Sequence, residues 1–198
     1  MVRLDRRQLI SHGTCLALGA GLGAWALRPG APGGTARVQA DDRKETHEQR
    51  LVKLGLELPK LATPKVPIYP AVQVGNMLYV SGHTPPPRDG KPVVGKVGKD
   101  VSIEDAQKAA HDIGRLILAV VRQQMGTLNN VVRLVKTLGM VNCTPEFTQQ
   151  PQVINAFSEL MIQVFGPIAG KAARSAVGMA SLPGGVPVEI ECIFHVKE

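Results

Sequence analysis

The segment PVEIECIFHV at residues 187–196 constrains the fold more than any other part of the chain. Its apolar residues alternate with other residues, and this period of two predicts a β-strand because successive side chains of a strand point to opposite faces. One face would carry Val188, Ile190, Cys192 and Phe194, and the other would carry Glu189, Glu191, Ile193 and His195. The second face mixes carboxylates with an isoleucine, so it is neither an ordinary core nor an ordinary solvent face.

Four further strands are predicted upstream. Residues 71–82 contain two short β-type runs broken by Gly75-Asn76, which favours a hairpin. Residues 131–143 are rich in β-branched side chains and are bounded by turn residues. Residues 173–181 form a run of small and apolar residues that leads into a Leu-Pro-Gly-Gly turn. These segments and the last strand predict a five-stranded sheet.

Helices are predicted between the strands. Ser102 followed by Asp105 resembles a capping box at the start of a helix over residues 102–121. Apolar residues recur in this helix at helical spacing, namely Ala106, Ala110, Ile113, Ile117 and Val120. Residues 145–166 are predicted as a second amphipathic helix, with Pro151 disturbing its first turns. A shorter amphipathic stretch within 47–61 is expected to lie on the domain surface.

The order ββαβαββ predicts an α+β fold in which two helices cover one face of a mixed sheet. A chain of 198 residues with 44% hydrophobic residues is long enough for one domain with a sizeable core. No further element of the chain is left to cover the face with the glutamates. Other subunits are therefore the natural candidate to cover it.

The first forty residues resemble an export signal. Arg6-Arg7 precedes a Gly- and Ala-rich apolar run, which is typical of the twin-arginine type, and cleavage is expected near Ala40. An uncleaved anchor helix is the alternative, which the glycines of this run make weaker. We expect an exported, periplasmic protein without stable membrane association after signal removal. Its parts would be the signal at 1–40, an extension with a short helix at 41–66, and the main domain at 67–198.

Charge and aromatic content argue against a nucleic-acid partner. Residues 1–40 hold five of the 23 basic residues and one of the 16 acidic ones, so residues 41–198 carry a net charge of only +3. This part has no tryptophan and few other aromatic residues, several of which fall in helix stripes. Binders of single-stranded nucleic acid stack bases on aromatic side chains, so we expect no nucleic acid to bind.

Cysteines and histidines do not indicate a metal site. Cys15 falls in the signal, and Cys143 and Cys192 lie in apolar strand patterns. These patterns favour buried free thiols, although an exported protein would permit a disulfide. No pair of cysteines or histidines in residues 41–198 has the spacing of a metal site, so we expect neither a metal nor another cofactor.

Several segments resemble the Rid family, also called YjgF-like or L-PSP proteins. They are GNMLYVSGHTP at 75–85, SIEDAQKAAHDIGRLILAVV at 102–121 and RSAVGMASLPGGVPVEIE at 174–191. Three more are similar to a longer, divergent branch of the family, namely LGLELPKLATPKVPIYPAVQVGN at 54–76, QPQVINAFSELMIQVFG at 150–166 and GKAARSAVG at 170–178. The resemblance implies a chorismate-mutase-like fold, a homotrimer, and clefts that lie between subunits.

The resemblance also implies a chemistry. Archetypal members hydrolyse imine and enamine intermediates, such as 2-aminoacrylate, to a keto acid and ammonia. On this basis Arg174 would bind the substrate carboxylate, because a guanidinium offers two parallel donors to a carboxylate. Glu189 would hold or activate the attacking water as a general base. Ser81 matches a serine that lines the same cleft.

Two departures from the family pattern leave alternatives open. A cysteine two residues after the arginine is here Ala176, and a tyrosine before the Val-Gln pair is here Ala71, although Tyr69 could point into the same space. An imine or enamine deaminase and a non-catalytic trimeric module that binds small carboxylates therefore both remain, and whether the chain is an enzyme stays open. An endoribonuclease, as some members are described, is the weakest candidate. Arg174 could also pair with a strand glutamate at a subunit interface.

Overall fold

The computed structural model describes residues 45–61 and 67–198. The predicted export signal at 1–40 lies outside the described residues and stays a prediction. Five strands form one sheet in the order β1-β2-β5-β3-β4. Their bounds are Ala71–Val74 for β1, Met77–His83 for β2, Val131–Asn142 for β3, Ala173–Met179 for β4 and Val188–Val196 for β5.

The sheet is mixed, as the sequence predicts. β3 and β4 run parallel, and the other neighbouring pairs are antiparallel. Val74 pairs with Met77, so β1 and β2 are joined by the predicted two-residue turn, in which Gly75 has a φ of 56°. β5 occupies the centre of the sheet, and β4 forms one edge.

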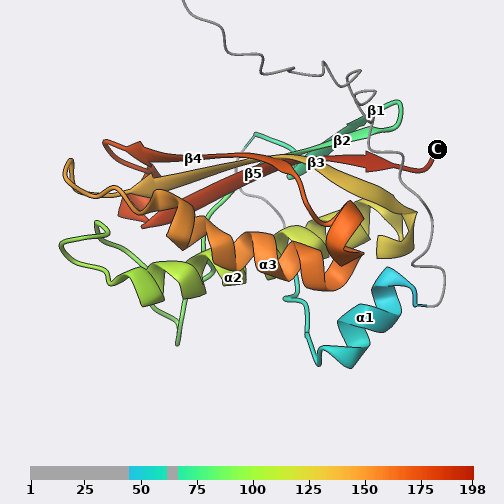
Figure 1. Cartoon of the computed structure of the whole chain (residues 1–198), viewed down its shortest axis with the longest axis horizontal. Coiled ribbons are helices and arrows are strands. Elements are labelled where there is room, and N and C mark those ends of the chain that lie inside the picture. Colours follow the sequence, from blue (N-terminus) through green and yellow to red (C-terminus); the bar gives the residue numbers. More distant parts are fainter. Residues whose placement is uncertain (1–44, 62–66) are drawn as a thin grey trace, which may run out of the picture. The chain divides into compact units, whose positions relative to one another are not determined.

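Two long helices cover one face of the sheet (Figure 1). α2 spans Ile103–Met125 and α3 spans Gln150–Ala169. The Ser102 hydroxyl accepts a 3.0 Å hydrogen bond from the Asp105 backbone N–H, so the predicted start of α2 is confirmed. All five predicted apolar positions of α2 are buried. The element order ββαβαββ and the α+β fold are confirmed.

The prediction for the second helix was wrong at its start, and α3 continues past the predicted end at residue 166 to Ala169. α3 begins at Gln150 and not at Pro145, and Pro151 lies in its first turn. A proline there does not disturb the helix, because a backbone N–H at that position has no partner within the helix. The irregularity lies instead near the C-terminal end, where Gly166 has a φ of 86° and Pro167 follows.

The short N-terminal helix α1, His47–Lys53, ends well before the predicted residue 61. Its Leu51 is buried, and its His47 ring meets Phe165 of α3 edge to face at 5.1 Å. The Glu48 carboxylate accepts hydrogen bonds from the Leu128 backbone N–H and the Thr127 hydroxyl. α1 is thus held against the domain by both apolar and polar contacts. A 3₁₀ turn at Leu128–Asn130 precedes β3, and another at Pro183–Gly185 precedes β5.

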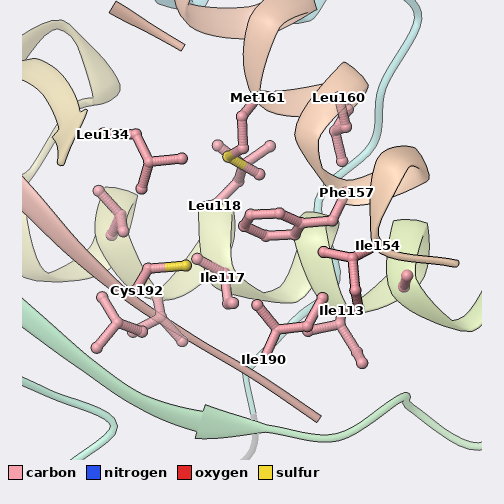
Figure 2. Close-up of a cluster of buried hydrophobic side chains, with 14 of the residues drawn as sticks. Ile113, Ile117, Leu118, Leu134, Ile154, Phe157, Leu160, Met161, Ile190 and Cys192 are labelled. Atoms are coloured by element: carbon pink, nitrogen blue, oxygen red, sulfur yellow. The ribbon is translucent and has the colours of Figure 1, made fainter. Parts of the chain in front are cut away.

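The core lies between the sheet and the two long helices (Figure 2). Ile190 and Cys192 of β5 face Ile117 of α2 and Phe157 of α3, and all four side chains are at most 2% exposed. Burial of each such large apolar side chain contributes roughly 1.5–3 kcal/mol to folding. The alternation of β5 therefore places its apolar half in the core, as predicted.

The opposite face of the sheet, here called the outer face, carries the other half of β5. Strand pairing places Glu189, Glu191 and Ile193 of β5 there, next to Tyr79 of β2 and Leu138 of β3. Among the described residues, no helix packs on this face (Figure 1). None of the helices in that part of the chain is long and apolar enough to cross a membrane.

Candidate functional site

Arg174 lies on the edge strand β4 and points toward the helices. It pairs with Thr137 of β3, a residue that is buried beneath them. Its Nη1 donates hydrogen bonds to Oδ1 of Asn155 at 2.9 Å and to Oγ of Ser158 at 3.0 Å, both on α3. The half-buried guanidinium is therefore held in a fixed orientation between β4 and α3.

These two bonds use both N–H groups of Nη1 and leave the other three donors of Arg174 available. No described residue accepts a hydrogen bond from Nε or Nη2. These two nitrogens form the parallel pair of donors that a carboxylate accepts in a bidentate contact. The local structure thus presents a preoriented, open fork.

A cavity of about 420 Å³ adjoins this arginine and is here called the Arg174 cavity. Its walls include Leu134, Thr137, Ser158, Ile162, Lys171 and Arg174. No aspartate or glutamate of the described chain lines it. The volume is that of a small-molecule site, and the mixture of apolar walls with a few polar groups is typical of one.

Glu189 lies on the outer face and not in the Arg174 cavity. Its carboxylate packs directly over Gly82 of β2, where a methyl group in place of the glycine hydrogen would lie 3.0 Å from its Cδ and overlap its Oε1. Partial burial raises the pKa of the Glu189 carboxyl, and the nearby charge of Glu191 raises it further. Such a carboxyl is shifted toward the pH at which a general base works best.

Ser81 lies in β2 directly before Gly82, and Tyr69 is hydrogen-bonded to it from the segment before β1. The Ser81 hydroxyl donates a 2.7 Å hydrogen bond to the Tyr69 carbonyl, and the Tyr69 side chain is 76% exposed. The pairing of β2 with β5 shifts register between Val80 and His83. This bulge places Ser81 and Gly82 beside the β5 glutamates.

The four predicted site residues therefore fall into two groups on opposite faces of the sheet. Arg174 belongs to the helix-covered face, whereas Glu189, Ser81 and Tyr69 belong to the outer face and its rim. Within the described chain, Arg174 makes no ion pair with Glu189 or Glu191. Arg174 and Glu189 therefore do not form one site within the described part of a single chain.

The two alanines that depart from the family pattern, Ala71 and Ala176, add no polar side chain to either of these two groups of residues. Ala71 begins β1 and is 7% exposed, and Ala176 packs against the core on the same side of β4 as Arg174. Neither side chain carries a polar group that could contact a ligand. The exposed ring of Tyr69 stays the candidate to replace the missing tyrosine.

The thiols of the described chain are not placed for catalysis. Cys143 and Cys192 are buried and free, which confirms that prediction. Burial raises the pKa of the Cys192 thiol well above its usual range, so a thiolate nucleophile is disfavoured there. His83 is half-buried, and burial lowers the pKa of its imidazole because it disfavours the charged form. The ring is therefore kept neutral. Among the described residues, no group of three His, Cys, Asp or Glu side chains could hold a metal ion.

Sequence reasoning did not identify the two residues that orient Arg174. Asn155 and Ser158 stand three positions apart on α3, so they lie on one side of the helix, next to the apolar stripe. The sequence did contain one signal for them, because these two short polar residues lie beside the buried apolar stripe of α3. The sequence does not show, however, which strand this side of α3 faces.

Known proteins resemble this chain over most of its described length. The family Endoribonuclease L-PSP matches residues 61–196. Protein TCP17 of Trypanosoma cruzi is 36% identical over 147 residues, which cover 74% of this chain and 92% of TCP17. The crystal structure of Atu1372 from Agrobacterium tumefaciens is 41% identical with a TM-score of 0.68, and the match covers 77% of this chain and 93% of Atu1372. A crystal structure from Shewanella oneidensis is 25% identical with a TM-score of 0.71, over 77% of this chain and 100% of that one.

Proposed function

The chain belongs to the Endoribonuclease L-PSP family, and on that premise we propose that it is a Rid-like hydrolase of imines and enamines, with an active site shared between two subunits. One observation carries the proposal. Asn155 and Ser158 hold Nη1 of Arg174, its other donors have no described partner, and the residue lines a cavity of ligand size. This arrangement suits a planar carboxylate attached to a planar imine.

A homotrimer would bring the two groups of residues together. The outer face leaves Tyr79 and Val72 exposed at 46% each, so it has apolar side chains that a second copy can cover. In a closed ring, the β4 edge of each subunit can meet the outer face of its neighbour, and this contact repeats around the ring. Each contact then combines Arg174 of one subunit with Glu189 of the next. A mass measurement in solution tests the assembly, and a monomer at micromolar concentration would contradict it.

The chemistry follows from these roles. Arg174 binds the carboxylate and positions the adjacent C=N carbon. Glu189 accepts a proton from a water molecule as the water oxygen forms a bond to that carbon. Glu189 passes this proton to the nitrogen, which gives a carbinolamine. It then moves the hydroxyl proton of the carbinolamine to the nitrogen as well, so that the C–N bond breaks while the C=O bond forms, and ammonia and a keto acid leave. An enamine enters the same sequence after it is protonated at carbon to the imine.

Turnover of 2-aminoacrylate and of imines of larger amino acids tests the proposal. Arg174→Lys keeps the charge and loses the donor pair, so we expect substrate binding to weaken roughly tenfold to a hundredfold. Glu189→Gln keeps the shape and loses the base, so turnover should fall while keto acids still bind. Arg122→Lys, on the far side of the helices in an ion pair with Glu48, is the matched control and should change neither.

Two results would contradict the proposal in different ways. Keto acid binding without turnover in the unchanged protein would identify the non-catalytic carboxylate-binding module, for which the alanines at 71 and 176 argue. Cleavage of RNA that Arg174→Lys and Glu189→Gln leave unchanged would identify a ribonuclease that does not use this site.

We also propose that the twin-arginine segment directs export to the periplasm. This proposal rests on the sequence of residues 1–40 alone.

A further inference from the structure

Lys171 brings a second positive charge to the Arg174 cavity. The chain leaves α3 at Gly170, which packs so closely against the helix that a Cβ there would lie 2.6 Å from the Cα of Ile162. Only glycine permits this approach, and it turns the chain back along α3 toward β4. Lys171 therefore begins the return segment beside the cavity, three residues before Arg174.

The backbone of Lys171 is fixed by a hydrogen bond, whereas its ammonium group has no partner among the described residues. The Lys171 carbonyl accepts a 3.3 Å hydrogen bond from Nη2 of Arg133. Its Nζ has no hydrogen bond or ion pair with any described residue. Two cationic residues thus line the cavity, and no carboxylate of the described chain lines it to neutralise them.

A ligand with a single carboxylate would satisfy only one of these cations. Lys171 and Arg174 are three positions apart in the chain, so their Cα atoms are at most about 10 Å apart, and both side chains are long enough to meet the two ends of a small diacid. Leu134 and Ile162 supply apolar wall for the methylene groups between the carboxylates.

We propose that the Arg174 cavity selects substrates with two carboxylates: Arg174 binds the one next to the imine carbon, and Lys171 binds the distal one. The inference rests on the proposed role of Arg174 and adds the substrate class, namely imines of dicarboxylic amino acids. Lys171 is a specificity-determining residue in this account and takes no part in bond breaking.

A purely structural role for Lys171 makes a different prediction. The residue follows the C-terminal end of α3, where a cation is favoured by the helix dipole. In that case Lys171→Met would lower the melting temperature and leave the preference among ligands unchanged. The two roles are therefore separated by comparing ligands within each variant.

The test is calorimetric titration of the full-length protein with 2-oxoglutarate and with 2-oxopentanoate. These acids have the same carbon chain and differ only in the distal carboxylate. We expect 2-oxoglutarate to bind about tenfold more tightly or better, as one further charge-assisted contact provides. Lys171→Met should remove this preference by weakening 2-oxoglutarate alone. Lys99→Met, in a separate cavity, makes the same change in net charge and should keep the preference.

Equal binding of the two acids to the unchanged protein would overturn the inference, as would an equal loss of both in Lys171→Met. Loss of the preference in Lys99→Met would assign it to net charge and overturn the inference as well. The diacid preference without any imine hydrolysis would retain the inference about the cavity and reject the deaminase. Failure of both acids to bind would reject the carboxylate site itself, and the inference with it.

Discussion

Replacement of Gly82 by alanine should separate the position of Glu189 from the stability of the fold. Gly82 does not have a positive φ, so alanine fits its backbone conformation. The new methyl group would overlap Oε1 of Glu189 and lie 3.0 Å from its Cδ, whereas favourable contacts begin near 3.5 Å. The carboxylate is the free end of a flexible side chain, so it should move by about 1 Å while the sheet stays in place.

A displacement of about 1 Å in a reacting group can lower a rate about a hundredfold. We therefore expect Gly82→Ala to lower kcat for imine hydrolysis by about that factor. The free energy of unfolding should be unchanged or higher by about 0.4–1 kcal/mol, because alanine restricts the unfolded chain. Steady-state kinetics and urea unfolding of the same preparation measure both quantities.

The control for this prediction is the same substitution in a Glu189→Gln background. If the methyl group acts by displacing the carboxylate, Gly82→Ala should cause little further loss once the base is absent. Full activity in Gly82→Ala would refute the reasoning, because it would show that the carboxylate position over Gly82 is not the one used in catalysis. A large decrease in the free energy of unfolding would refute the claim that only the Glu189 side chain moves.

Further changes test other parts of the account. Glu191→Gln removes a negative charge that raises the pKa of Glu189, so the acidic limb of the pH–rate profile, along which the base loses its proton, should move to lower pH. Phe157→Ala should lower the free energy of unfolding by about 3–5 kcal/mol in chemical denaturation, because the ring is fully buried between the helices and the sheet. Replacement of Arg6-Arg7 by two lysines should keep the protein in the cytoplasm, as cell fractionation would show, and unchanged export would reject the twin-arginine proposal.

The fold could be predicted where the sequence has a strong period or a clear terminus. β5 alternates large apolar residues with polar ones, so both of its faces could be assigned, and Ser102 marks the start of α2. The predicted end of the second helix at residue 166 coincides with the irregular Gly166-Pro167 of α3. The start of α3 was missed because residues 145–149 were read as part of the helix, whereas Pro145 and Glu146 form a turn and residues 147–149 have no regular structure.

The candidate site was less predictable because β4 has no period. Its residues, ARSAVGM, are mostly small, so no alternation shows which face Arg174 occupies. That face depends on the parallel pairing with β3, which brings together residues far apart in the sequence. The partners Asn155 and Ser158, and the cavity shared with Lys171, depend on the same pairing. The family resemblance could identify the residues but not their separation onto two faces.

Subunit complementation tests the shared site most directly. Arg174→Lys and Glu189→Gln chains, each with a different affinity tag, are co-expressed, and assemblies that carry both tags are purified. In a cyclic trimer every mixed assembly has one contact in which an intact Arg174 meets an intact Glu189, so we expect about one third of the activity of the unchanged protein. With substrate well below KM, where weaker binding lowers the rate, both parent assemblies should be far less active than the mixed ones. Mixed assemblies no more active than their parents would contradict a site built from two subunits.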